Sequence, residues 1–217
     1  DRVITGYTRR REWVERTYYF VIEFDYPIVS KEELPLRDPR EKAMRHVLQF
    51  DLQEGDILQM KVAMSTTGVE GAKANLAAEV PAWDFDAVHR SAREAWNGYL
   101  SRVQIEGTDD DKANFYTSLY HLYIQPNDIA DINGRYVGPT RQIEQSSTGK
   151  YYSTLSQWDT FRAAFPMYTL LSPEIVDDLV NSMLEFSEQK GHLPIWALMG
   201  QETYTMIGNH SIPMIVG

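Results

Sequence analysis

Two short segments in the last third of the chain place carboxylates beside aromatic rings. The first is Gln157-Trp158-Asp159-Thr160-Phe161-Arg162, and the second runs from Glu202 to His210. A sugar ring offers apolar C–H faces that stack on Trp or Tyr, and hydroxyls that donate in pairs to a carboxylate. These residue types therefore predict carbohydrate binding, with Trp158, Asp159, Glu202 and His210 as the candidate contacts.

Each candidate residue also has a structural alternative. Asp159 lies near the start of a predicted helix, where it could cap or stabilise the positive N-terminus while Trp158 fills the core. Arg162, three residues later, could pair with Asp159 under either interpretation. Glu202 lies in a segment without periodicity and could make a buried turn contact, and His210 could be a satisfied histidine near a helix start. The pattern leaves both alternatives open.

Composition and motifs exclude several other kinds of function. The 217 residues carry a net charge of −10 and include no cysteine, which argues against a nucleic-acid partner and removes disulfides and thiol chemistry. The one dense basic run, Arg9-Arg10-Arg11, is followed by Glu12 and Glu15 and is interpreted as a solvated strand end. No apolar stretch approaches the roughly 18 residues that span a bilayer. Nucleotide-binding, serine-hydrolase and metal-binding motifs are also missing from the sequence.

The first part of the chain, to about Thr67, has the pattern of an antiparallel sheet with one solvated face. The run 18–24 is aromatic and β-branched, and apolar residues alternate with other residues from Leu58 to Met64, the period of a half-buried strand. Between these strands, the charged segment 30–42 contains two prolines and is predicted to be an exposed loop.

After Gly71 the pattern becomes helical. The first predicted elements are a short helix over 72–78, a helix capped by Asp84 with an apolar stripe to Val103 and a stop signal at Gly107, and a helix over 109–124. A hairpin turn at Asn133-Gly134 is predicted between 129–132 and 135–137. The remaining elements are a helix from near Ser156 through Tyr168, a helix capped by Ser172 that ends at Gly191, and an apolar helix at the C-terminus.

Several blocks of the sequence resemble, in order and spacing, those of family 92 of the glycoside hydrolases, the calcium-dependent exo-acting α-mannosidases. They are Val69-Glu70-Gly71-Ala72-Lys73-Ala74-Asn75-Leu76, Trp83-Asp84-Phe85, Ala95-Trp96-Asn97, 115–121, 133–136, 158–162 and 202–210. The resemblance implies an α+β, two-domain fold in which the C-terminal part of a β-sandwich (1–67) leads through a helical linker (68–107) into the first helices of an (α/α) barrel (108–217). It also implies a secreted or periplasmic enzyme, and we expect the chain to be an internal segment of a longer protein.

The family removes terminal α-linked mannose from mannosides or N-glycans with inversion, and the resemblance favours an α-1,2-mannosidase. Inversion needs an acid and a base about 6.5–9.5 Å apart. The resemblance implies that both lie beyond Gly217. This chain should then supply part of the substrate shell, namely Trp158 and Asp159, with Glu202 and His210 nearby. A bound calcium ion and a mannose-containing glycan are the implied cofactor and partner, together with the remainder of the polypeptide. Gln201 departs from the family, where Asn often precedes the Glu. The alternative is a non-catalytic sugar-binding or interaction module.

Overall fold

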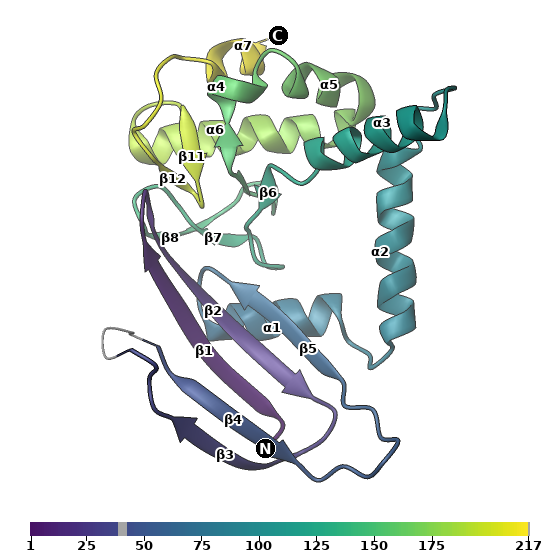
Figure 1. Ribbon diagram of the computed structural model, residues 1–217. Helices are drawn as coiled ribbons and strands as arrows, with labels where there is room; N and C mark the ends of the chain where they lie inside the picture. The colour runs from purple at the N-terminus through teal and green to yellow at the C-terminus, as the bar shows by residue number, and fades with distance from the viewer. Residues whose placement is uncertain (39–42, 217) are drawn as a thin grey trace.

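The computed structural model describes residues 1–38 and 43–216. Figure 1 shows a strand-rich half built from the first part of the chain and a helix-rich half built from the rest. This order of strands followed by helices agrees with the predicted α+β plan. No helix in the described ranges combines the length and the hydropathy that crossing a membrane would require.

The strand-rich half consists of a three-stranded antiparallel sheet, a separate hairpin and one covering helix. The sheet has the order β1 (Val3–Arg11), β2 (Glu15–Phe24) and β5 (Met60–Ser65), the hairpin pairs β3 (Ile28–Leu34) with β4 (Arg45–Phe50), and the helix is α1 (Val69–Glu79). Val21 from the sheet and Ala72 and Leu76 from α1 form a small buried core. Helix α1 therefore closes one face of the sheet.

Two predictions for this half were wrong. The segment 30–42 was predicted to be a loop, but Ser30–Leu34 pairs with β4 as part of β3, because backbone pairing at an exposed edge tolerates charged side chains. Residues 39–42 lie outside the described ranges. In β5 the strand itself was predicted correctly, whereas Met60 and Met64 are 58% and 59% exposed. Helix α1 packs instead on the alternate face, where the small side chains of Ala63 and Ser65 leave it room.

The helix-rich half contains long helices and short strands. Its elements are α2 (Phe85–Leu100), α3 (Asp109–Leu122), β6 (Asn127–Asp128), β7 (Arg135–Val137), β8 (Ile143–Gln145), β9 (Tyr152–Ser153), β10 (Leu155–Ser156), α4 (Gln157–Thr160), α5 (Ala164–Leu171), the 3-10 helix η1 (Pro173–Ile175), α6 (Val176–Lys190), β11 (Trp196–Leu198), β12 (Gln201–Glu202) and α7 (Ser211–Val216). Its core is formed by Leu155, Phe165, Tyr168, Leu179 and Met183.

For α2, the sequence signals predicted the first residue of the helix better than its last residue. Asp84 caps α2 by accepting from the amide of Ala87 at 2.8 Å, as predicted, but the helix stops at Leu100 rather than continuing toward Gly107. The helix predicted from Ser156 is divided into α4 and α5. Pro166 explains the division, because proline is tolerated in the first turn of α5 but not in the interior of one continuous helix.

The predicted hairpin at Asn133-Gly134 is only partly correct. The turn exists, with Gly134 at a φ of 78° and its amide bonded to the Asp131 carbonyl at 2.7 Å. Strand β7, however, forms its ladder with β8, and the segment before the turn contributes a backbone bond from the Asp131 amide to the Arg135 carbonyl at 2.8 Å. The segment before the turn is also held elsewhere, since the Ile132 amide donates to the Asn75 side chain of α1 at 2.9 Å.

The carboxylate of Asp131 connects the two halves of the protein. It is 2% exposed and accepts from Ser65 at 2.8 Å, from Thr67, and from the Asn75 side chain at 2.9 Å. A side chain at position 71 would collide with this carboxylate and with the Ser65 hydroxyl, which explains the glycine there. A buried charge without a cation is tolerated only when several donors satisfy it. Asp131 therefore depends on, and fixes, the contact between β5, α1 and the turn before β7.

We expect Asp131→Ala to lower the free energy of unfolding by about 2 kcal/mol or more, because it leaves buried donors of the strand-rich half without the acceptor that the helix-rich half supplies. Asp131→Asn should cost less, since the Ser65 and Thr67 hydroxyls can rotate to suit an amide. Urea denaturation of each variant measures the difference, with the exposed Glu54→Ala as the control. An Asp131→Ala variant as stable as the control would show that the junction does not depend on this carboxylate.

Candidate functional site

A small antiparallel sheet brings the two predicted sugar-binding segments together. Strand β10 pairs with β11, with Ser156 opposite Trp196, and β11 pairs with β12, with Ala197 opposite Glu202. Trp158 follows Ser156 by two residues, so this pairing places the first segment beside the strands that lead to Glu202. More than 40 residues separate Trp158 from Glu202 in the sequence. Figure 1 shows α4, α7 and this sheet on the same side of the helix-rich half.

The fully buried Gln157 locks this arrangement. With its amide oriented to satisfy its neighbours, its nitrogen donates to the carbonyl of Pro194 at 2.6 Å and to that of Ile195 at 3.1 Å, while its oxygen accepts from Ser211 at 3.0 Å. The Ser211 hydroxyl alternatively donates to the Pro194 carbonyl. One side chain at the start of α4 thus holds the loop before β11 and the start of α7.

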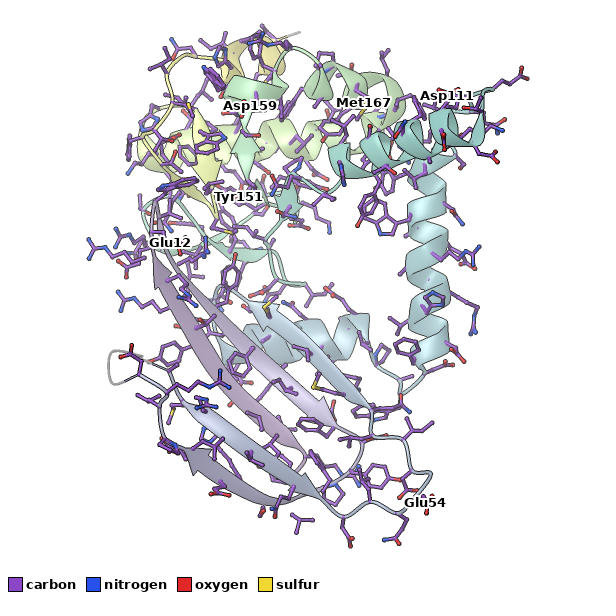
Figure 2. All side chains as sticks on the ribbon, viewed as in Figure 1. Glu12, Glu54, Asp111, Tyr151, Asp159 and Met167 are labelled. Atoms are coloured by element: carbon purple, nitrogen blue, oxygen red, sulfur yellow. The ribbon has the colours of Figure 1, made fainter. Side chains whose placement is uncertain are left out.

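Trp158 and Asp159 lie exposed on α4. The Trp158 side chain is 40% exposed, and Asp159, labelled in Figure 2, is exposed in the first turn of the helix. Ser156 occupies the N-cap, and within the described ranges the Asp159 carboxylate makes neither a hydrogen bond nor an ion pair. The suggested pair with Arg162 does not form, since that guanidinium lies 5.0 Å from the centre of the Phe161 ring. The hydrogen bonds of α4 therefore do not show Asp159 capping this helix.

Glu202 is buried, at 6% exposure, and its carboxylate is occupied by backbone amides. It accepts from Ile195 at 2.7 Å, from Trp196 at 3.1 Å, from Thr203 at 3.0 Å and from Tyr204 at 3.4 Å. These bonds join the chain before β11 to the chain after β12. The structural alternative, a buried turn contact, is thus present in the structure, and direct sugar contact by Glu202 stays a prediction.

His210 lies against the segment that carries Trp158. Its imidazole stacks on the Phe161 ring with centroids 4.2 Å apart and planes inclined by 11°. Gly208 lies close on the ring, because a Cβ there would come within 2.6 Å of the His210 Nε2 atom. The structure therefore places His210 beside the segment that carries Trp158 and Asp159, while Glu202 organises the neighbouring loop.

The tip of the β1–β2 hairpin was not identified as part of the site from the sequence, yet it contacts this loop. The Trp13 and Trp196 rings lie 5.6 Å apart, and the Gln201 side chain donates to the Glu15 carbonyl at 2.6 Å. This bond gives Gln201, the residue that departs from the family pattern, a defined contact. The Tyr18 hydroxyl donates to the Met199 sulfur; burial raises the pKa of Tyr18, and the charge of Arg16 partly offsets that rise.

The described residues provide no ready calcium site. Within the described ranges, no group of three or more His, Asp or Glu side chains is placed to hold a metal ion. An aromatic cavity of about 260 Å³ lies between α2, the segment that follows α3, and α5, but its lining includes none of the four candidate residues. Burial raises the pKa of two of its tyrosines, Tyr152 and Tyr168, to about 12, so both hydroxyls are neutral at physiological pH.

We expect Glu202→Gln to destabilise the loop, because an amide group would face backbone N–H donors in place of one carboxylate oxygen. The loss should be about 1.5–3 kcal/mol of unfolding free energy, the range for a hydrogen bond to a charged group. Thermal unfolding and limited proteolysis between residues 196 and 208 measure it, with Glu188→Gln on the exposed face of α6 as the matched control. Unchanged stability combined with weaker sugar binding would instead assign Glu202 to the ligand.

Comparison with known proteins identifies the group to which this architecture belongs. The model of the glycosyl hydrolase family 92 catalytic domain matches residues 71–217. Because this match covers more than half of the chain, the protein belongs to family 92 of the glycoside hydrolases. The comparison with curated proteins gave no match.

Solved structures of the same family superpose on nearly the whole chain. The family GH92 α-mannosidase BT3965 from Bacteroides thetaiotaomicron aligns with a TM-score of 0.88 and 28% identity over 99% of this chain and 31% of its own. The family GH92 inverting mannosidase BT2199 from Bacteroides thetaiotaomicron VPI-5482 aligns at 0.86 and 30% identity over the same shares. The structure of ccman5, at 23% identity and a TM-score of 0.73, shows the fold alone. The chain thus spans about a third of these relatives, and the predicted plan of sandwich strands followed by barrel helices is confirmed.

Proposed function

We propose that this chain is part of an exo-acting, inverting α-mannosidase that releases terminal mannose, with a preference for α-1,2 linkages in mannosides or N-glycans. Membership of family 92 supports the proposal, as do similarities to an inverting mannosidase and to BT3965, which has also been solved in complex with mannoimidazole. The observation that carries it is the pair of Trp158 and Asp159, exposed next to each other in the first turn of a short helix, with a carboxylate that has no partner among the residues that the structure describes.

The chemistry of this pair suits a terminal hexose. An unpaired carboxylate can accept from two neighbouring hydroxyls of one sugar, and the indole offers an apolar face for the C–H side of the same ring. His210 is proposed to donate to a further hydroxyl. For Glu202 a direct sugar contact is retained only as a secondary role, because backbone amides already occupy its oxygens.

The general acid and base, the roles of the three segments and the location of the protein are proposed from the family resemblance. We propose that the general acid and base come from polypeptide beyond Gly217, so that residues 1–67, 68–107 and 108–217 act as sandwich part, linker and start of the catalytic barrel. A secreted or periplasmic location is proposed from the family resemblance. The alternative, a non-catalytic sugar-binding module, would keep the Trp158 and Asp159 pair without hydrolysis.

We expect Asp159→Asn in the full-length protein to lower kcat/KM for an α-mannoside by about 10²-fold or more. The reason is the loss of two charge-assisted hydrogen bonds to hydroxyls, each worth about 1.5–3 kcal/mol. The melting temperature should hardly change, because Asp159 bonds to nothing in the described ranges. Trp158→Ala should also weaken binding through lost stacking.

The control is Asp110→Asn, an exposed carboxylate in the first turn of another helix, α3. If Asp159→Asn lowers the melting temperature and keeps kcat/KM within about threefold, a change below roughly 1 kcal/mol, the residue stabilises α4 and the site assignment is wrong. Sugar binding without any hydrolysis by the unaltered protein would favour the non-catalytic module.

We expect the full-length protein to lose activity when a chelator removes divalent ions and to regain it with calcium. Calcium prefers about 6–8 oxygen ligands. Because the described residues form no such cluster, ligands from the rest of the polypeptide, sugar hydroxyls and water would have to complete the shell. Activity assays before and after chelation and dialysis measure the effect. Full activity after exhaustive chelation would rule out calcium dependence.

A further inference from the structure

Trp13 is an exposed tryptophan at the tip of the β1–β2 hairpin. Its side chain is 66% exposed, whereas its neighbour Val14 is 7% exposed and anchors the turn. The Glu12 amide donates to the Val14 carbonyl at 3.2 Å, which closes the tip tightly. The indole is therefore presented to solvent from a turn of defined shape.

The hairpin tip is fixed onto the loop of the candidate site. The Gln201 side chain donates to the Glu15 carbonyl at 2.6 Å, and the Glu15 carboxylate pairs with Arg141 at 3.1 Å. These contacts join a strand of the first half to the β11–β12 turn and to the loop before β8. Figure 1 shows the hairpin reaching this region, and Figure 2 marks its tip with Glu12.

Trp13 continues the candidate site outward. Its ring lies 5.6 Å from that of Trp196, inclined by 43°, and Trp196 pairs across the sheet with Ser156, two residues before Trp158. The backbone of Trp196 thus lies beside the strand that precedes Trp158 and Asp159, and its ring lies beside Trp13. Trp13 as a residue is 66% exposed, so most of its surface is not used in packing on Trp196.

Carboxylates match three of the arginines around the tip. Glu15 pairs with both Arg9 and Arg141, and Glu12 lies 3.9 Å from Arg16. These cations are already matched by carboxylates, so they offer little to a phosphate or sulfate group. Arg10 and Arg11, exposed on the same hairpin, leave the rim net positive. It is therefore the apolar face of the indole, and not the balance of charge, that suits a sugar ring.

We propose that Trp13 is a stacking platform for the sugar to which the terminal mannose is attached, so that the strand-rich half contributes to selection of the leaving group. This inference rests on the proposed function and assigns a residue of the hairpin to the outer part of the same site. Trp13 would act on the leaving sugar and not on the mannose held by Trp158 and Asp159.

The test compares two substrates of the full-length enzyme, mannobiose and α-mannosyl fluoride, whose leaving group is one atom. Trp13→Ala should raise KM for mannobiose by about tenfold, the size of one lost stacking contact, and leave the kinetics on the fluoride unchanged. Trp13→Phe, which keeps an aromatic face and the packing on Trp196, should retain most of the affinity for mannobiose. Tyr7→Ala, which removes a 67% exposed ring from the same hairpin, is the matched control.

Equal effects of Trp13→Ala on both substrates, or no effect on either, would overturn the platform. If Trp13→Ala does not fold, the comparison rests on Trp13→Phe and on Trp13→Leu, which keeps apolar packing without an aromatic face and should lose affinity for mannobiose alone. Failure of the proposed function has a different signature, because the unaltered enzyme would then release mannose from neither substrate.

Discussion

The structure depends on a polar junction between two separate apolar cores. In the described ranges, the core around Val21 and Leu76 and the core around Leu179 and Met183 share no residue. The halves therefore cannot be aligned by one continuous hydrophobic interior. Their relative position is set by hydrogen bonds, above all those that the buried Asp131 accepts from Ser65, Thr67 and Asn75. Hydrogen bonds are directional, so this junction fixes an orientation as well as a contact.

That orientation determines where the β1–β2 hairpin reaches. Its tip meets the β11–β12 turn through Gln201 and Glu15, and the same turn is tied to the preceding loop by the amides that Glu202 binds. A carboxylate shared by several amides is difficult to replace, since each lost bond leaves a buried donor unpaired. Both halves thus hold in place the loop that lies beside the segment of Trp158 and Asp159.

Local signals in the sequence predicted most elements but not how they pair. Caps and glycines predicted the start of α2 and the end of α6, because those effects act within a few residues. The predicted partner of β7 and the predicted buried face of β5 were wrong, because both depend on residues that are distant in the sequence. Asn75 binds the segment expected to pair with β7, and α1 packs on the face of β5 that has small side chains. Trp13 was missed for the same reason, because an exposed tryptophan in a turn gives no signal until the fold brings Trp196 beside it.

The two carboxylates predicted together as sugar ligands are separated by their surroundings. Both follow the same sequence pattern of an acid beside aromatic residues. In the described part of the chain, however, Glu202 is buried with its oxygens bound to amides, whereas Asp159 is exposed and has no partner. A ligand must displace existing bonds to use the first, whereas it displaces only water from the second, so the free energy available for binding is larger at Asp159. Pattern alone cannot make this distinction, because it does not show which backbone amides a carboxylate will meet. The structure therefore separates the two residues: Glu202 holds the loop, whereas Asp159, exposed and without a partner among the described residues, is the one we propose as the sugar ligand.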